Sequence, residues 1–306
     1  MLVRFAAMAL LAAPVLAQAP EDGAPPAAPT WTLTTGFRAP ESAYYDTASG
    51  HVFVSSINGQ ILEKDGNGYI SRLSPDGEML DEMWVTGLDA PKGLRSDGGT
   101  LWVSDIDRVV GIDIASGAVT ARVAVEGATF LNDLATGPDG TVYVSDSSQS
   151  RIYMVRDGRS SVFVEGAELV EQANGLLVDG GRLVLGTIGP AGGRGRGRGA
   201  AAGGHLFAFD LASRERTQVT TEPVGGIDGI EPDGRGGLLV TDVFGRRLLH
   251  VAPSGAVRTL VQFDGGGADF GYIAARRLAI VPFLNESRVA AYDLTALLPQ
   301  VAPVVR

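Results

Sequence analysis

A motif that returns at intervals of about 40 residues constrains this chain more than any other feature. Each copy starts with a polar residue, often followed by Gly, and ends in a short apolar segment that the clearest copies close with Ser or Thr and then Asp. The clearest copies are KGLRSDGGTLWVSD (92–105), NDLATGPDGTVYVSD (132–146) and DGIEPDGRGGLLVTD (228–242), and the others are ESAYYDTASGHVFVSS (41–56), NGLLVDGGRLVLGT (174–187) and DFGYIAARRLAIVP (269–282). Repeats of this length with several short strands each are typical of propeller blades. Six copies therefore predict an all-β fold, a six-bladed β-propeller.

The residues that open the copies are unevenly spaced, which locates two insertions. They are Glu41, Lys92, Asn132, Asn174, Asp228 and Asp269, with separations of 51, 40, 42, 54 and 41 residues. The first long interval contains LEKDGNGY (62–69), which we expect to extend a hairpin, and the second contains GPAGGRGRGRGAAAGG (189–204), which we expect to be a flexible, solvated loop. We also expect WTLTTGF (31–37) to pair as a strand into the last blade and close the ring.

The segment before the repeats indicates an exported protein. Arg4 precedes an apolar stretch from Phe5 to Ala17 that is too short to span a bilayer, so we predict a signal peptide at 1–19. A Pro/Ala-rich linker is expected at 20–30 and the propeller domain at 31–306. The mature chain is then periplasmic or secreted, with no membrane span, and its lack of Cys excludes disulfides and thiolate metal sites.

The net charge and the remaining motifs restrict the classes of partner and of site that the chain is expected to have. A net charge of −10 disfavours nucleic acid and anionic membranes, so the expected partner is a small-molecule substrate, with the oligomeric state left open. The stretch DGNGYISRLSPDGE (65–78) has Tyr69 and Ile70 where an EF-hand needs an acid or amide and then Gly. His51, His205 and His250 are too far apart in the sequence to suggest a zinc site, and no nucleophile elbow occurs.

The opening residues share one register of the repeat. The first strand of every propeller blade lines the central axis, so side chains in that register should form a ring at one height of the channel. All of them except Lys92 carry a side-chain oxygen. Carboxylate and amide oxygens are the ligands that calcium prefers, and unpaired buried charges are costly. The ring therefore predicts one divalent metal ion, with calcium favoured and zinc, manganese or magnesium as alternatives. A single Asn-Gly or Asp-Gly pair is also a common turn, so the prediction depends on the shared register.

The same motifs resemble the senescence-marker-protein/gluconolactonase family, also called regucalcin-like, over residues 35–294. The family's opening Glu motif appears as ESAYYD without its Gly-Pro pair, and its other motifs appear as NDL (132–134), ANGL (173–176) and DGI (228–230). The resemblance implies that Glu41, Asn174 and Asp228 bind the metal, with Asn132 as a fourth ligand or a substrate contact. APKGL (90–94) resembles one exported branch of that family.

These residues suggest a hydrolase that opens a lactone or a related ester. The cation would polarise the carbonyl and activate a water molecule. Asp228 is the expected general base, as the resemblance implies, with Asp133 and Asp269 in reserve. Lys92 would stabilise the oxyanion or bind an acidic substrate, and Asn132, Lys92 and Asp269 are the expected substrate contacts.

Two alternatives stay open from the sequence. One is a propeller that binds a metal and a ligand without catalysis, since propellers serve many functions. The other is a related enzyme on the same scaffold, of the organophosphate-hydrolase or strictosidine-synthase type.

Overall fold

The computed structural model describes residues 28–189 and 203–298. The predicted signal peptide, most of the predicted linker and most of the Gly/Arg loop lie outside the described residues.

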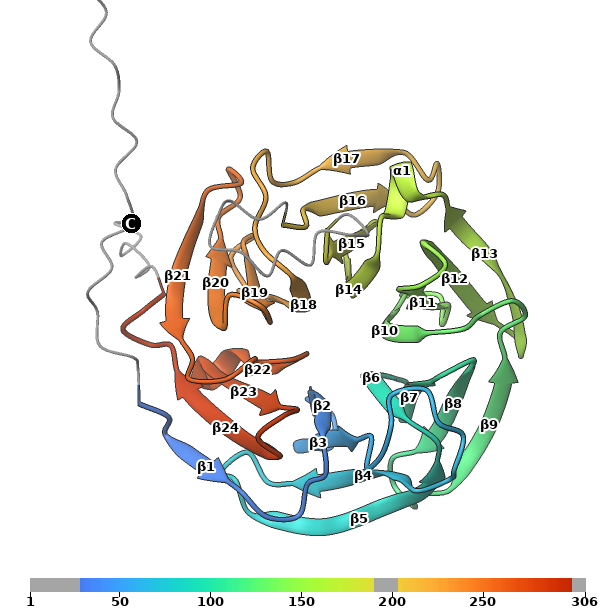
Figure 1. The fold of residues 1–306 in the computed structure, drawn as a ribbon, viewed down its shortest axis with the longest axis vertical. Coiled ribbons are helices and arrows are strands. Elements are labelled where there is room, and N and C mark those ends of the chain that lie inside the picture. Colours follow the sequence, from blue (N-terminus) through green and yellow to red (C-terminus); the bar gives the residue numbers. More distant parts are fainter. Residues whose placement is uncertain (1–27, 190–202, 299–306) are drawn as a thin grey trace, which may run out of the picture.

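Six four-stranded antiparallel sheets stand around a central axis, as Figure 1 shows, and we number them as blades 1 to 6 in chain order of their innermost strands. Blade 1 contains β2 (Pro40–Asp46), β3 (His51–Ser56), β4 (Gly68–Leu73) and β5 (Met79–Leu88); blade 2 contains β6 (Pro91–Asp97), β7 (Thr100–Asp105), β8 (Arg108–Asp113) and β9 (Val119–Ala124). Blade 3 contains β10 (Leu131–Thr136), β11 (Val142–Asp146), β12 (Arg151–Arg156) and β13 (Arg159–Glu165); blade 4 contains β14 (Ala173–Asp179), β15 (Arg182–Thr187), β16 (Leu206–Asp210) and β17 (Arg216–Gln218). Blade 5 contains β18 (Ile227–Pro232), β19 (Leu238–Asp242), β20 (Arg247–Val251) and β21 (Val257–Gln262); blade 6 contains β22 (Gly271–Ile273), β23 (Leu278–Phe283), β24 (Arg288–Asp293) and β1 (Trp31–Leu33). The predicted all-β, six-bladed propeller is confirmed.

Helical structure within the described ranges is limited to two short turns. They are α1 (Ala167–Val170) and the 3₁₀ turn η1 (Ala274–Arg276). No helix in these ranges is long and apolar enough to cross a membrane.

The hydrophobic core lies between the faces of neighbouring blades. One cluster packs Phe53 and Ile70 of blade 1 against Leu94 and Leu101 of blade 2, and similar clusters recur around the ring. Because both faces of a blade are covered, a central strand such as β11 is buried at every position. This burial of apolar surface is the main stabilising contribution to the fold.

Strand β1 closes the ring by completing blade 6. It pairs antiparallel with β24, from Trp31 opposite Ala291 to Leu33 opposite Val289. The predicted closure is therefore correct, although only three of the seven residues expected to form this strand are paired. Trp31 also packs against the β4–β5 turn of blade 1, where a Cβ on Gly77 would lie 2.7 Å from its indole ring.

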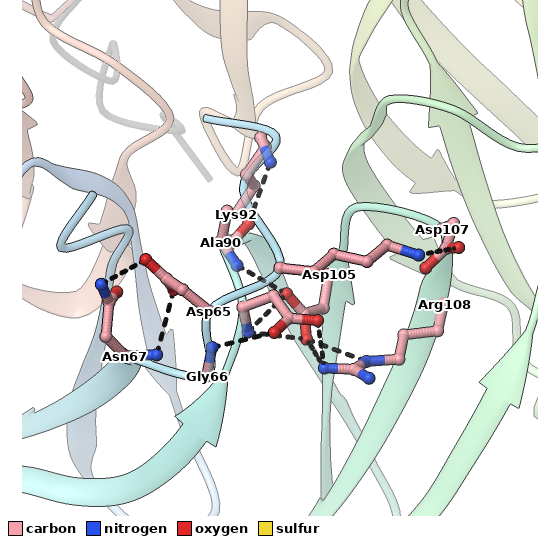
Figure 2. A network of polar contacts seen from close by, with 10 residues as sticks. Asp65, Gly66, Asn67, Ala90, Lys92, Asp105, Asp107 and Arg108 are labelled. Atoms are coloured by element: carbon pink, nitrogen blue, oxygen red, sulfur yellow. Dashed lines mark hydrogen bonds and ion pairs between the residues drawn. The ribbon is translucent and has the colours of Figure 1, made fainter. Parts of the chain in front are cut away.

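The first insertion differs from the prediction, because the residues before Gly68 form a loop rather than the arms of a hairpin. Within this loop at 57–67, the amide of Asn67 donates to Asp65 Oδ1 over 3.2 Å, and the amide of Gly66 donates to Asp89 Oδ1 of blade 2 over 3.0 Å. Lys64 forms an ion pair with Asp107 of the same blade. The loop is therefore held both by hydrogen bonds within itself and by contacts with blade 2 (Figure 2).

Candidate functional site

A bulge at the start of each of the first five inner strands positions the ring residues. In β6, Pro91 pairs with Asp105 and regular pairing resumes only at Leu94, which leaves Lys92 and Gly93 outside the ladder. Strands β2, β10, β14 and β18 break register at the same point, at Glu41, Asn132, Asn174 and Asp228. A bulge bends the strand and redirects a side chain. In blade 6, Asp269 lies just before β22 and bridges Ser42 of β2.

Glycine follows three of the ring residues because neighbouring inner strands approach closely there. A Cβ on Gly175 would lie 2.2 Å from the carbonyl oxygen of Asp228, and one on Gly93 would lie 2.5 Å from Asp133 Oδ1. A Cβ on Gly229 would lie 2.7 Å from Asp269 Oδ1. The Gly of the sequence motif is thus a packing requirement of the ring.

The hydroxyl near the end of the motif joins one blade to the next. Ser145 Oγ accepts the amide of Asp133 over 3.1 Å and donates to the carbonyl of Asn174 in blade 4 over 2.8 Å. Thr241 makes the corresponding bridge from blade 5 to blade 6, and Ser104 donates from blade 2 to blade 3. These bridges fix the backbone that carries the ring residues.

The closing Asp of the motif holds the turn that leads into the inner strand. Asp105 Oδ1 accepts the amide of Ala90 over 2.8 Å, and its Oδ2 lies 2.7 Å from Arg108 Nη2 (Figure 2). Asp146 and Asp242 accept amides from the corresponding turns of blades 3 and 5. These three carboxylates therefore have structural roles.

The structure brings the ring carboxylates into one electrostatically coupled group. Burial raises the pKa of Glu41 well above its ordinary value, and the charge of Asp228 adds to this rise while Lys92 opposes it. Burial and the charge of Asp269 raise the pKa of Asp228 to about 7. Burial also raises the pKa of Asp269, against the attraction of Arg95 and the hydrogen bond from Ser42. Glu41, Asp228 and Asp269 therefore lie close enough for their charges to influence one another.

Three oxygens of the ring are buried without a hydrogen-bond partner among the described residues. They are Glu41 Oε2, Asn174 Oδ1 and Asp269 Oδ1. The other half of the Asn174 amide donates to Asp228 Oδ1 over 2.9 Å. Buried polar atoms are normally paired, so several orphaned acceptors in one register point to a missing positive or proton-donating partner.

Lys92 and Asn132 take up the other two positions of the predicted site. Lys92 is only 1% exposed, and its ammonium donates to the carbonyls of Ala90 and Ile61 over 2.9 and 3.1 Å. Burial lowers its pKa, against the attraction of Glu41 and Asp105. Asn132 donates from Nδ2 to Ser147 Oγ over 3.2 Å.

Asp133 has a different setting from the other acids. Its Oδ1 accepts the amide of Leu134 and its Oδ2 accepts the amide of Leu176, each over 2.7 Å. The carboxylate therefore ties β10 to β14, and both of its oxygens are engaged with backbone amides. Of the three acids predicted as possible bases, Asp228 is therefore better placed than Asp133 to accept a proton.

An ion pair that the sequence analysis missed crosses the channel next to the ring. Arg95 Nη1 lies 3.2 Å from Glu231 Oε1, and the guanidinium stacks 5.3 Å from the ring centre of Tyr44. Burial opposes the charge of Arg95, but Glu231, Asp269 and Asp133 together raise its pKa. Burial raises the pKa of Glu231 to about 7 despite the attraction of Arg95. The sequence held a signal, since both residues stand three places after a ring residue, where other copies have aromatic or aliphatic side chains.

The predicted metal ligands carry the type of donor atom, oxygen, that a hard divalent cation prefers. Glu41, Asn132, Asn174 and Asp228 offer two carboxylates and two amide groups, with orphaned oxygens on two of these residues. Oxygen donors of this mixture suit calcium better than softer metals. Within residues 28–189 and 203–298, no three His, Cys, Asp or Glu side chains are arranged to hold a metal together. A cation at the ring would therefore depend on the amide oxygens.

Comparison with solved structures identifies the architecture. A gluconolactonase from Xanthomonas campestris superposes with a TM-score of 0.63 at 17% sequence identity, covering 89% of this chain and 96% of that one. The chain is a six-bladed β-propeller. Virginiamycin B lyase from Staphylococcus aureus matches this propeller with a TM-score of 0.57 at 13% identity, over 86% of this chain and 98% of the lyase. A chain of the nidogen–laminin complex matches with a TM-score of 0.58 at 15% identity, over 74% of the propeller and 90% of that chain.

Comparison at the level of sequence finds no match for this chain. No protein-family model matches the sequence, and no curated protein is significantly similar to it. At these identities the structural matches establish the fold, which hydrolases, lyases and binding proteins share.

Proposed function

We propose that this propeller is a metal-dependent hydrolase that opens a lactone or a related ester at the mouth of its channel. The observation that carries the proposal is the cluster of orphaned buried oxygens on Glu41, Asn174 and Asp269 beside the raised pKa of Asp228. Perturbed acids in such a setting are frequent at catalytic sites. The fold shared with a gluconolactonase supports the same reaction class.

Glu41, Asn132, Asn174 and Asp228 are the residues that would hold the cation. When bound, a divalent cation supplies Lewis-acid polarisation of the substrate carbonyl and makes water more acidic. The side-chain amide of Asn174 donates a hydrogen bond to Asp228 Oδ1 and so orients the carboxylate. Asp228 Oδ2 receives no hydrogen bond from the described residues. Oδ2 is therefore the proton-accepting atom in the proposal.

The chemical step is a hydrolysis that needs no other reactant than water. Asp228 Oδ2 takes a proton from a water molecule as the water oxygen bonds to the carbonyl carbon of the lactone. The C–O bond within the lactone ring then breaks. The proton passes from Asp228 to the leaving alkoxide, which completes the hydroxy acid. Lys92, buried beside Glu41, would lower the cost of negative charge on the carbonyl oxygen.

A binding propeller without catalysis is the second candidate. The observation that favours it is the engagement of Lys92 with two carbonyls and of Asp133 with two amides, which reduces the number of free catalytic groups. For the compartment we propose the periplasm or the exterior, on the basis of the leader-like first residues.

Metal removal separates the two candidates. The purified chain is assayed for metal content and for hydrolysis of a lactone panel before and after chelation, and then with calcium, magnesium, manganese or zinc added back. We expect turnover to be lost on chelation and restored by one divalent ion, together with an increase in melting temperature on binding. Bound metal without turnover on any lactone would favour the binding propeller, and a chain that binds no divalent ion would refute the metal site.

A further inference from the structure

Exposed apolar side chains stand on two sides of the ring, in loops on the same face of the propeller. Phe244, in the turn between β19 and β20, is 69% exposed. Ile61 and Leu62, in the loop at 57–67, are 46% and 48% exposed. Exposed apolar surface that is rimmed by polar residues marks ligand-binding or interaction sites, whereas single apolar residues scattered over a surface do not.

Both apolar groups contact the segments that carry ring residues. The Phe244 ring covers Gly226, where a Cβ would come within 2.4 Å of it, and Gly226 stands two residues before Asp228. On the other side, the carbonyl of Ile61 accepts a hydrogen bond from the Lys92 ammonium over 3.1 Å.

These two sides face each other across the channel. The ion pair between Arg95 and Glu231 spans from β6 to β18, so these strands are opposite one another within reach of two side chains. Lys92 and Asp228 each stand three residues earlier on the same strands. The ring residues therefore lie nearer than the ion pair to the end of the channel where the inner strands begin. A molecule that enters from that end passes between Phe244 and the loop at 57–67 to reach the ring.

We propose that the mouth selects a substrate with an apolar substituent, and that Phe244, Ile61 and Leu62 are the residues that contact this substituent. The inference rests on the proposed hydrolase function and specifies its substrate class as alkyl-substituted lactones rather than polyhydroxylated ones. These side chains offer no hydrogen bonds to sugar hydroxyls, whereas each methylene that they cover is removed from water.

The anchoring of the loop at 57–67 gives Ile61 and Leu62 a fixed position for contact with the apolar substituent. Lys64 pairs with Asp107, and Gly66 donates to Asp89, so the loop is fastened to blade 2 just after Ile61 and Leu62 in the sequence (Figure 2). An anchored apolar surface loses less conformational freedom on binding than a free loop does.

Hydrolysis of γ-lactones with alkyl chains of increasing length tests the proposal, alongside a sugar lactone. We expect kcat/KM of the wild type to rise about two- to fourfold per added methylene. Phe244→Ser and the double variant Ile61→Ser/Leu62→Ser should flatten this dependence, with a larger loss for long-chain lactones than for the unsubstituted lactone. Leu80→Ser, at an exposed apolar position on the outermost strand β5, is the matched control and should keep the wild-type dependence.

A binding measurement keeps the result separate from the proposed hydrolysis. Alkyl-substituted cyclopentanones, which water does not hydrolyse, are titrated into the same variants by calorimetry. Binding that strengthens with chain length and weakens in Phe244→Ser supports the apolar mouth even if no lactone is turned over. Turnover that is indifferent to chain length, preference for the sugar lactone, or neither binding nor turnover would each overturn it. Binding to phosphatidylcholine vesicles through Phe244 without a chain-length effect would assign these side chains to a lipid surface instead.

Discussion

At the scale of single residues, Asp228 combines the features expected of a proton acceptor. One carboxylate oxygen is held by the Asn174 amide, the group is almost fully buried, and its pKa is raised to about 7. A base with a pKa near the working pH is effective in both accepting and returning a proton. Glu41, beside it, keeps one buried oxygen without a donor.

Replacing this carboxylate tests the assignment. Asp228→Asn should lower kcat/KM for the best lactone at least about 100-fold, because the isosteric amide accepts no proton. The melting temperature should not fall, since the variant removes a buried acid whose charge is disfavoured. Asp157→Asn, at a side chain that is 92% exposed, is the control and should be unchanged in both assays. Activity within threefold of the wild type in Asp228→Asn would remove this residue from the mechanism.

The sequence predicted these residues through register and missed others that depend on contacts across the axis. Glu41, Asn174 and Asp228 open their repeats, and symmetry alone brings them together. The pairing of Arg95 with Glu231 joins opposite blades, and a linear repeat does not state which side chains meet there. The engagement of Asp133 with two amides was likewise hidden, because it depends on the close approach of β10 and β14.

At the scale of elements, the bulged starts of the inner strands are the features that create the site. Pairing in β14 breaks between Ala173 and Leu176, so that Asn174 and Gly175 leave the ladder. Alternation of apolar residues predicts strands but does not reveal a bulge, which is why these strand starts were not predicted in detail. The hairpin extension predicted at 62–69 is instead mostly a loop for a related reason. Its contacts are made to blade 2, as when the amide of Gly66 donates to Asp89, and the sequence does not reveal such contacts.

A methyl group at the bulge tests the packing argument. Gly175→Ala would place a Cβ only 2.2 Å from the carbonyl oxygen of Asp228, so the two strands must separate. We expect a loss of about 1–3 kcal/mol in the free energy of unfolding, measured with urea, and weaker cation binding. Gly181→Ala in the following turn has open space around its Cβ and serves as the control. Equal stability of the two variants would contradict the close packing of β14 and β18.

At the scale of the whole molecule, closure depends on a three-residue strand from the opposite end of the chain. Trp31 of β1 packs with Val289 and Ala291 of blade 6 and with Leu73 of blade 1, so it spans the junction of the ring. The sequence predicted this closure as the pairing of 31–37 into the last blade.

Truncating this side chain should loosen the junction. Trp31→Ala removes a half-buried indole and should lower the free energy of unfolding by about 2 kcal/mol, less than a fully buried Trp would cost. Met83→Ala, 51% exposed on β5, should change stability by less than about 0.5 kcal/mol. Chemical denaturation followed by circular dichroism measures both, and an unchanged midpoint for Trp31→Ala would argue against the closure.

The burial of the Glu231 carboxyl gives stability a pH dependence. Burial raises the pKa of Glu231 to about 7 from an ordinary 4.5, so the folded chain binds this proton more tightly than the unfolded chain. Its contribution to stability is then greatest below pH 4.5 and declines as the pH rises towards 7. Glu231→Gln abolishes this change, and the wild type should lose its advantage over the variant between pH 5 and pH 8 when both are unfolded with urea in chelator. A difference that grows with pH would contradict the assignment.

The pairing of β1 with β24 also has a consequence for the order of events in folding. The two strands are separated by nearly the whole described chain, and contacts of such long range form late, since their loop-closure entropy must be met first. Every blade contributes one residue to the ring, from Glu41 in the first to Asp269 in the last. The ring is therefore incomplete in any intermediate with five blades, and we expect ligand binding to report the completion of folding.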